Sequence, residues 1–291
     1  DRSNRLSQLM MELGIAEGDR VALLARNCSE YLEVELAAAK TGIIIAALNW
    51  RLAARELNHC IQLVEPSLTI VQSEFVEALD GLGLDHRHRL IIGTEYEDKL
   101  ACSSSIFPNK AIDPEAGLVI LYTSGTTGFP KGATLSHHNI LNNGYFVAST
   151  MNFTEQDRLV VPVPLYHCFG MVMGNLGCLT HGACAIYPSE GFEPEAVLKA
   201  VQQEKATALY GVPTMFIAEL ALPDFSKYDL ATLRTGIMAG APCPVETMKQ
   251  VNDLMHMTEV EIAYGMTETS PVSFQTRVDS PLDKRVSTVG S

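Results

Sequence analysis

Residues 118–132, LVILYTSGTTGFPKG, contain the strongest pattern in this chain. The apolar run Leu118–Leu121 has the length and composition of a buried strand. The segment after it is rich in Gly, Ser and Thr and contains Lys131. Glycines let backbone N–H groups converge on an anion, and hydroxyls and a lysine add donors and positive charge. We therefore predict a phosphate-binding loop after a buried strand, formed by Thr123, Ser124, Gly125, Thr126, Thr127, Gly128 and Lys131.

The spacing differs from that of a Walker A loop, in which a Gly-Lys-Ser/Thr run begins five residues after the first glycine. Here Pro130 occupies the fifth position after Gly125, and Gly132 follows Lys131. A flexible surface loop is the alternative interpretation of the same composition. Pro130 disfavours it, because a proline stiffens one end of the loop.

The segment 122–132, YTSGTTGFPKG, resembles the phosphate loop of the adenylate-forming superfamily. That superfamily contains acyl-CoA synthetases, luciferases and the adenylation domains of peptide synthetases. The resemblance implies the α/β fold of the N-terminal large domain, with stacked β-sheets flanked by helices in αβαβα layering. It covers nearly the whole chain and is strongest to medium-chain fatty-acyl-CoA ligases, because of the segments 210–216, 223–229 and 237–244.

Composition limits the classes of function. The chain has 291 residues, of which 47% are apolar, so it can bury a sizeable core. Its net charge of −13 and the lack of a basic stripe argue against a nucleic-acid partner. Seven cysteines without a Cys-x-x-Cys pair argue against a disulfide framework and favour a reducing compartment. We expect a cytoplasmic protein, or a mitochondrial matrix protein in a eukaryote.

The stretch Cys168–Tyr187 has no Asp, Glu, Lys or Arg and superficially resembles a membrane span. Polar residues interrupt it, and Gly182 suggests a turn, so we predict no membrane span but a buried helix followed by a buried strand. A zinc site is the alternative for its His and Cys residues, but their irregular, apolar setting favours small buried side chains. The residues concerned are His167, Cys168, Cys178, His181 and Cys184.

Strand and helix patterns alternate along the chain, which predicts parallel sheets with helices on their faces. The expected strands are 21–25, 43–48, 68–71, 90–92, 118–121, 158–163, 183–187, 208–210, 235–238 and 260–263. The expected helices are 6–13, 29–40, 53–64, 137–147, 194–204, 214–222 and 244–255, the sixth of them capped by Thr214. A Ser- and Pro-rich loop at 101–117 suggests a subdomain boundary.

Two polar turns follow predicted strands, where ligands bind in open α/β sheets. The first is Gly240-Ala241-Pro242, whose small residues let the backbone approach a flat ring; an ordinary strand-to-helix turn is the alternative. The second is 264–269, YGMTET, in which Tyr264 can stack on adenine, Thr267 can donate to phosphate, and Glu268 can ligate Mg²⁺. A solvated polar turn is the alternative there. The resemblance assigns adenine or AMP binding to Gly240, Ala241, Pro242, Tyr264, Gly265, Met266 and Thr267.

A third segment, Tyr166–Gly170, also follows a predicted strand. A histidine among apolar residues is usually packed in a core, but the similar family motif borders the acyl-binding tunnel. The resemblance therefore implies that His167 lies near the substrate carboxylate. The predicted acyl-substrate residues are Tyr166, His167, Gly170, Val212 and Met266, and the predicted catalytic residues are Lys131, His167, Thr267 and Glu268.

The resemblance implies an ATP- and Mg²⁺-dependent acid–thiol ligase that forms a fatty acyl-adenylate and then an acyl-CoA thioester. Its partners would be a carboxylic acid, ATP and coenzyme A, with a homodimer as a further possibility. An aryl-CoA ligase and a non-catalytic nucleotide- or acyl-binding module are alternatives. Amino-acid activation is disfavoured, because no Asp lies near 165–170 to pair with a buried ammonium group. We expect residues 1–291 to be an incomplete N-terminal adenylation domain, with the C-terminal domain, the ribose-binding Asp and a catalytic Lys outside the chain.

Overall fold

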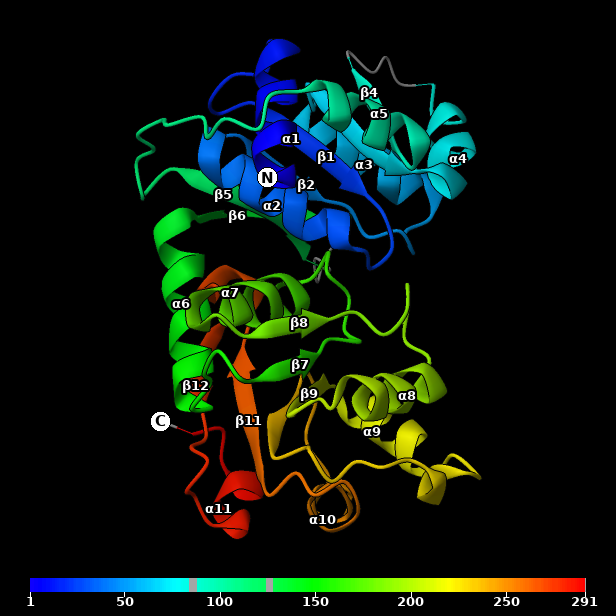
Figure 1. The fold of residues 1–291 in the computed structure, drawn as a ribbon, viewed down its shortest axis with the longest axis vertical. Helices are drawn as coiled ribbons and strands as arrows, with labels where there is room; N and C mark the ends of the chain where they lie inside the picture. The colour runs from blue at the N-terminus through cyan, green and yellow to red at the C-terminus, as the bar shows by residue number, and fades with distance from the viewer. Residues whose placement is uncertain (84–87, 124–127, 291) are drawn as a thin grey trace. The chain divides into compact units, whose positions relative to one another are not determined.

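The computed structural model describes residues 1–83, 88–123 and 128–290. The chain divides into two compact units, Asp1–Asn139 and Ile140–Ser291, each built around one sheet (Figure 1). The loop at 101–117, where the sequence suggested a boundary, connects α5 to β5 within the first unit.

The first unit has a six-stranded sheet in the order β4-β3-β1-β2-β5-β6. Its elements are α1 (Arg2–Glu12), β1 (Arg20–Leu24), α2 (Ser29–Thr41), β2 (Ile44–Ala47), α3 (Ala54–Val64), β3 (Leu68–Gln72), η1 (Ser73–Phe75), α4 (Val76–Asp80), β4 (Arg89–Ile92), α5 (Thr94–Cys102), β5 (Gly117–Thr123) and β6 (Lys131–Ser136).

Alternation along β1 explains how this sheet is covered on both faces. Ala22 and Leu24 pack with Leu57, Cys60 and Ile61 of α3 in one apolar cluster. The intervening residues of β1 point to the opposite face and are also fully buried, as expected for a parallel strand with helices on both sides. α1 packs against α2 and α5 in this unit.

The second unit has a six-stranded sheet in the order β12-β11-β10-β9-β7-β8. Its elements are α6 (His137–Thr150, which starts in the first unit), β7 (Arg158–Val160), the π-helix η2 (Phe169–Leu176), α7 (Gly177–His181), β8 (Cys184–Ile186), α8 (Pro194–Glu204), β9 (Ala208–Gly211), α9 (Pro213–Leu220), η3 (Phe225–Lys227), β10 (Thr235–Ala239), α10 (Val245–Leu254), β11 (Glu259–Gly265), η4 (Thr267–Thr269), β12 (Val272–Gln275) and α11 (Leu282–Ser287).

Helices cover both faces of this second sheet. Leu209 and Met238 join side chains of α8, α9 and α10 in one core cluster. Tyr210, the neighbour of Leu209 on β9, points the other way, and its hydroxyl lies 3.4 Å from the Met173 carbonyl of η2. Successive side chains of β9 thus pack against helices on opposite faces of the sheet.

Three expectations from the sequence need correction. Each sheet is mixed rather than purely parallel, because β6 and β12 pair antiparallel with their neighbours. The strand expected at 183–187 is not buried, because β8 lies at the edge of its sheet and Cys184 is exposed. The helix expected from Thr214 begins at Pro213, with Val212 as its N-cap, because proline is suited to the first helical position.

None of the helices within the described ranges combines the length and the apolar character needed to cross a bilayer. The apolar stretch after Cys168 instead forms η2, α7 and β8. All eight residues of η2 are buried, as the sequence predicted for a helix there.

Candidate active site

The polar turns predicted from the sequence lie at one edge of the second unit's sheet. β9, β10 and β11 pair in parallel, and β7 pairs in parallel with β9. Carboxyl ends of parallel strands meet at the same edge, which is where ligands bind in open α/β sheets. Three predicted segments follow these ends directly: Val212 after β9, Gly240–Pro242 after β10, and Met266–Thr269 after β11.

The turn after β10 requires a glycine. Gly240 has φ +86°, a left-handed conformation that residues with a side chain rarely adopt. A Cβ at this position would lie 3.2 Å from Cγ1 of Val212, so two predicted residues from neighbouring strands are adjacent. Gly240, Ala241 and Pro242 are all exposed, which leaves their backbone accessible to a planar ligand.

The turn after β11 is held by its own backbone. The β11–β12 pairing shifts register between Tyr264 and Gly265, and a Cβ at Gly265 would lie 1.9 Å from the Pro271 carbonyl oxygen. The Met266 N–H donates to that same oxygen over 3.1 Å. The bulge therefore admits only glycine at 265 and fixes the direction in which the following residues leave the strand.

The side chains beside this bulge are open to solvent. Tyr264 is 57% exposed, and its ring centroid lies 6.4 Å from that of Phe274 on β12. Met266 is 59% exposed. Large side chains left this open at a strand end are available to contact a ligand.

Thr267 and Cys168 bring two of the predicted segments together. The Thr267 Oγ1 lies 3.9 Å from the Cys168 Sγ, and both residues are buried. Burial raises the pKa of the Cys168 thiol to about 11, and the charge of Glu268 acts in the same direction. The thiol therefore stays protonated and packs against Thr267 instead of acting as a nucleophile.

His167 is held in one tautomer. The Phe169 N–H donates to His167 Nδ1 over 3.2 Å, so in the neutral ring the proton is on Nε2. Desolvation by the surrounding protein lowers the pKa of this imidazole, although the residue is exposed. At neutral pH the residue is a neutral donor through Nε2, the form suited to hydrogen-bond a carboxylate.

The two other predicted acyl-substrate residues of this segment are packed. Tyr166 is half-buried. Gly170, the second residue of η2, is buried, and a Cβ there would lie 2.5 Å from the Pro164 carbonyl oxygen. Gly170 thus permits the backbone of η2 to approach Pro164, and a π-helix of this kind often occurs near functional sites.

Glu268 is the candidate metal ligand. Its side chain is exposed, and no hydrogen bond or ion pair joins its carboxylate to another residue of the described ranges. A free carboxylate fits Mg²⁺, which commonly takes one or two carboxylates together with substrate phosphates and water. Residues 1–83, 88–123 and 128–290 contain no group of three or more His, Cys, Asp or Glu side chains that could hold a metal ion.

In the first unit, the predicted phosphate loop is the connection of a β-hairpin. β5 and β6 are antiparallel, with Thr123 opposite Lys131 and Tyr122 opposite Gly132. Lys131 was expected inside the loop but is the first residue of β6, because the hairpin ladder extends to it. Its side chain is exposed, and Gly128 has φ +148°. The predicted residues Ser124, Gly125, Thr126 and Thr127 lie outside the described residues.

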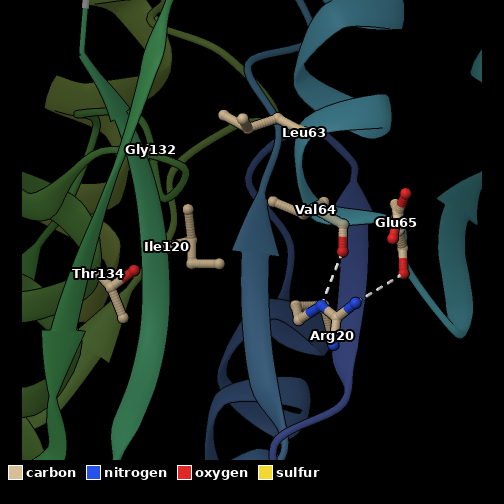
Figure 2. Close-up of a pocket in the computed structure, with 7 residues that line it drawn as sticks. All are labelled: Arg20, Leu63, Val64, Glu65, Ile120, Gly132 and Thr134. Carbon is tan, nitrogen blue, oxygen red and sulfur yellow. Dashed lines mark hydrogen bonds between the residues drawn. The ribbon is translucent and has the colours of Figure 1, made fainter.

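A hollow of about 380 Å³ lies elsewhere in the first unit (Figure 2). It is lined by Arg20, Leu63, Val64, Glu65, Ile120, Gly132 and Thr134, none of which is a predicted site residue. The Arg20 guanidinium donates to the carbonyls of Val64 and Glu65 at the end of α3, as Figure 2 shows. This cation therefore caps a helix C-terminus and is not free for a ligand.

Comparison with known proteins identifies the family of this chain. A family profile described as "AMP-binding enzyme" matches residues 1–291. The chain belongs to the AMP-binding enzyme family. A putative acyl-CoA synthetase, YngI of Bacillus subtilis, is 41% identical over 97% of this AMP-binding enzyme. The mitochondrial medium-chain acyl-CoA ligase ACSF2 of Danio rerio is 34% identical, also over 97%.

A solved structure supports the fold assignment. The inhibitor-bound N-terminal domain of FACL13 from Mycobacterium tuberculosis superposes with a TM-score of 0.90 at 26% identity, covering 99% of this chain and 73% of that one. The chain spans 57% of the length of YngI and 52% of that of ACSF2.

In each unit, several residues that contact the predicted segments were not predicted from the sequence. Phe274 lies beside Tyr264, and Pro271 packs against Gly265, but both come from β12 or the turn before it. Arg55 and His59 of α3 contact the end of the hairpin connection. No local motif marks these residues, because their roles depend on contacts with another element.

Proposed function

We propose that this chain activates a carboxylic acid with ATP, as part of an AMP-forming acyl-CoA ligase. The observation that carries the proposal is the convergence of Gly240, Tyr264, Thr267 and Glu268 at the carboxyl ends of the parallel strands β10 and β11. These residues offer an exposed backbone turn, an exposed aromatic ring, a hydroxyl and a free carboxylate. Groups of these kinds bind adenine, phosphate and Mg²⁺ in proteins.

Each group receives one part of the nucleotide. Tyr264 would stack on adenine while the backbone at Gly240–Pro242 borders the ring's edge. The Thr267 hydroxyl would donate to the α-phosphate. In the first unit, Thr123, Gly128 and Lys131 would bind the β- and γ-phosphates, with Lys131 supplying the charge.

Glu268 would hold Mg²⁺ together with phosphate oxygens of the substrate. When bound, the ion offsets the negative charge that develops on the leaving pyrophosphate. The chain's own contribution is an exposed carboxylate, placed directly after Thr267, that pairs with no residue of the described ranges.

His167 would orient the attacking carboxylate through Nε2–H. Tyr166, Gly170, Val212 and Met266 would border the acyl group. We propose a fatty acid as the substrate, since ACSF2 is named a medium-chain acyl-CoA ligase. Aryl acids are the alternative substrates against which this choice is tested.

The proposed reaction has two steps. A carboxylate oxygen attacks the α-phosphorus of ATP, the bond from that phosphorus to the bridging oxygen breaks, and pyrophosphate leaves. The sulfur of CoA then bonds to the acyl carbon, and the bond from that carbon to the oxygen that links it to phosphorus breaks. AMP leaves with this oxygen, and the thiol proton passes to solvent. The first step relies on positioning and charge neutralisation, which this arrangement supplies.

Carboxylate-dependent exchange of labelled pyrophosphate into ATP, measured on the full-length protein that contains this chain, tests the proposal directly. A panel of medium-chain fatty acids, long-chain fatty acids, aryl acids and amino acids separates the substrate classes. We expect exchange with fatty acids and none with amino acids. ATP binding without exchange for any acid would instead support a non-catalytic binding module.

A further inference from the structure

Helix α3 contacts the chain on both sides of the predicted phosphate loop. Before the loop, the Tyr122 hydroxyl donates to the Cys60 carbonyl over 2.8 Å. After the loop, Phe129 and Pro130 contact Arg55 and His59. The described residues on either side of 124–127 therefore contact the same helix.

The contact after the loop uses two kinds of interaction on adjacent residues. The His59 and Phe129 rings are stacked, with centroids 4.7 Å apart and planes inclined by 27°. The His59 Nε2 lies 3.2 Å from the Pro130 carbonyl oxygen. Since a carbonyl can only accept, His59 donates from Nε2 in this bond.

Arg55 holds the same aromatic ring. Its guanidinium carbon lies 5.0 Å from the centroid of the Phe129 ring, within the range of a cation–π contact. Arg55 and His59 are four residues apart on α3, so they share one face of the helix. Phe129 is 40% exposed, and both of these side chains contact its ring.

These contacts act on the residue before Lys131. Pro130 has a fixed φ, is buried, and leads directly into Lys131, which begins β6 opposite Thr123. Fixing Phe129 and the Pro130 carbonyl therefore fixes where the Lys131 backbone starts. A long lysine side chain delivers its charge to a chosen point only if its backbone is held.

We propose that Arg55 and His59 are positioning residues that place Lys131 for the terminal phosphates of ATP. The inference rests on the proposed function, in which Lys131 binds those phosphates. Arg55 and His59 act through Phe129 and Pro130 and contact no part of the nucleotide. Their loss should therefore affect ligands that carry β- and γ-phosphates and leave AMP binding unchanged.

The test is calorimetric binding of ATP and of AMP to the purified protein. Arg55→Ala and His59→Ala are each expected to raise the Kd for ATP about tenfold, as expected for one lost polar or cation–π contact. Both variants should keep the Kd for AMP within about twofold. Gln62→Ala, which changes an exposed residue of the same helix, is the matched control and should change neither.

Two further variants separate positioning from a general loss of structure. Arg55→Lys keeps a cation over Phe129, and His59→Gln keeps a donor toward Pro130, so each should recover most of the ATP affinity. In a Phe129→Leu background, Arg55→Ala should add less than about twofold, because its partner is already gone. The proposal would be overturned if ATP and AMP lost affinity equally, or if the conservative variants recovered no ATP affinity. It would also be overturned if Arg55→Ala had its full effect in the Phe129→Leu background.

Failure of the proposed function gives a different result. If the wild-type protein binds no ATP, or Lys131→Ala leaves the Kd unchanged, the phosphate-binding role itself is wrong. If Lys131→Ala weakens ATP binding while the α3 variants do not, only the positioning role is wrong.

Discussion

Lys131 lies directly opposite Thr123 across the antiparallel pair of β5 and β6. Directly opposed residues project to the same face of a sheet, with Cβ atoms about 4.5–5.5 Å apart. The lysine charge and a hydroxyl of the glycine-rich segment are therefore presented together. This pairing, together with the loop, defines the element of the first unit that we propose binds phosphate.

Lys131→Ala is expected to lower the rate of carboxylate-dependent pyrophosphate exchange by about 10²-fold, because a charge that stabilises the transferring phosphates is lost. Lys110→Ala, which removes another exposed lysine of the same unit, is the control. Exchange kinetics at saturating carboxylic acid measure the effect. Equal rates in wild type and Lys131→Ala would show that the hairpin is a surface feature.

Glu268→Gln should raise the Mg²⁺ concentration needed for half-maximal exchange by about tenfold, because an amide is a poorer ligand for Mg²⁺ than a carboxylate. The fold should be unaffected, since no described residue pairs with this side chain. A Mg²⁺ titration measures the metal requirement, and a thermal melt checks the fold. Asp253→Asn, at an exposed position, is the control. A titration midpoint that does not move contradicts the metal-binding role.

His167→Ala is expected to raise the KM for the carboxylic acid about 10-fold and to leave the KM for ATP nearly unchanged, because only the carboxylate loses a hydrogen-bond donor. His167→Gln should restore part of the affinity, since its amide can also donate. Steady-state kinetics with each substrate varied in turn provide the measurement. A change confined to the KM for ATP would place His167 beside the nucleotide instead.

Glu261 makes stability depend on pH. Burial raises the pKa of its carboxyl from the ordinary value of 4.5 to about 8, although Gln275 donates to it and Arg285 acts in the opposite direction. Between these values the folded state binds the extra proton, so the stability contributed by this group is present below pH 4.5 and is lost as the pH rises toward 8.

Glu261→Gln resembles the protonated acid and should therefore raise the melting temperature at pH 8 by a few degrees, since about 1 kcal/mol corresponds to roughly 2–4 °C in a domain of this size. The gain should be absent at pH 5, where the wild-type carboxyl is protonated in the folded state. Melts at both pH values, with Glu155→Gln as an exposed control, test this. An equal gain at both values would contradict the role of ionisation.

Gly170→Ala should destabilise the second unit by about 1–3 kcal/mol, because the new Cβ would lie 2.5 Å from the Pro164 carbonyl oxygen and backbone would have to move. Gly177→Ala is the matched control, since its Cβ would meet Ala148 at an ordinary 3.6 Å. Denaturant unfolding of both variants gives the comparison. Equal stability of the two would mean that the backbone at Pro164 adjusts freely.

Several helix ends and turns of this protein were determined by local sequence. Helix α8 was predicted with its observed bounds, and Gly42 ends α2 in a left-handed conformation, because proline and glycine act on the backbone at their own positions. The turns at Gly240 and Gly265 were also predicted from the residues after apolar strands. Their conformations need glycine for reasons visible within or beside the turn.

Other features depended on the tertiary structure alone. The antiparallel strands β6 and β12, the Thr123–Lys131 pairing and the exposure of the edge strand β8 follow from which strands become neighbours. The contacts of Arg55 and His59 with Phe129 and Pro130 join residues about 70 positions apart. Local propensity describes the backbone of one segment, whereas strand pairing and side-chain packing are decided when distant segments are buried together.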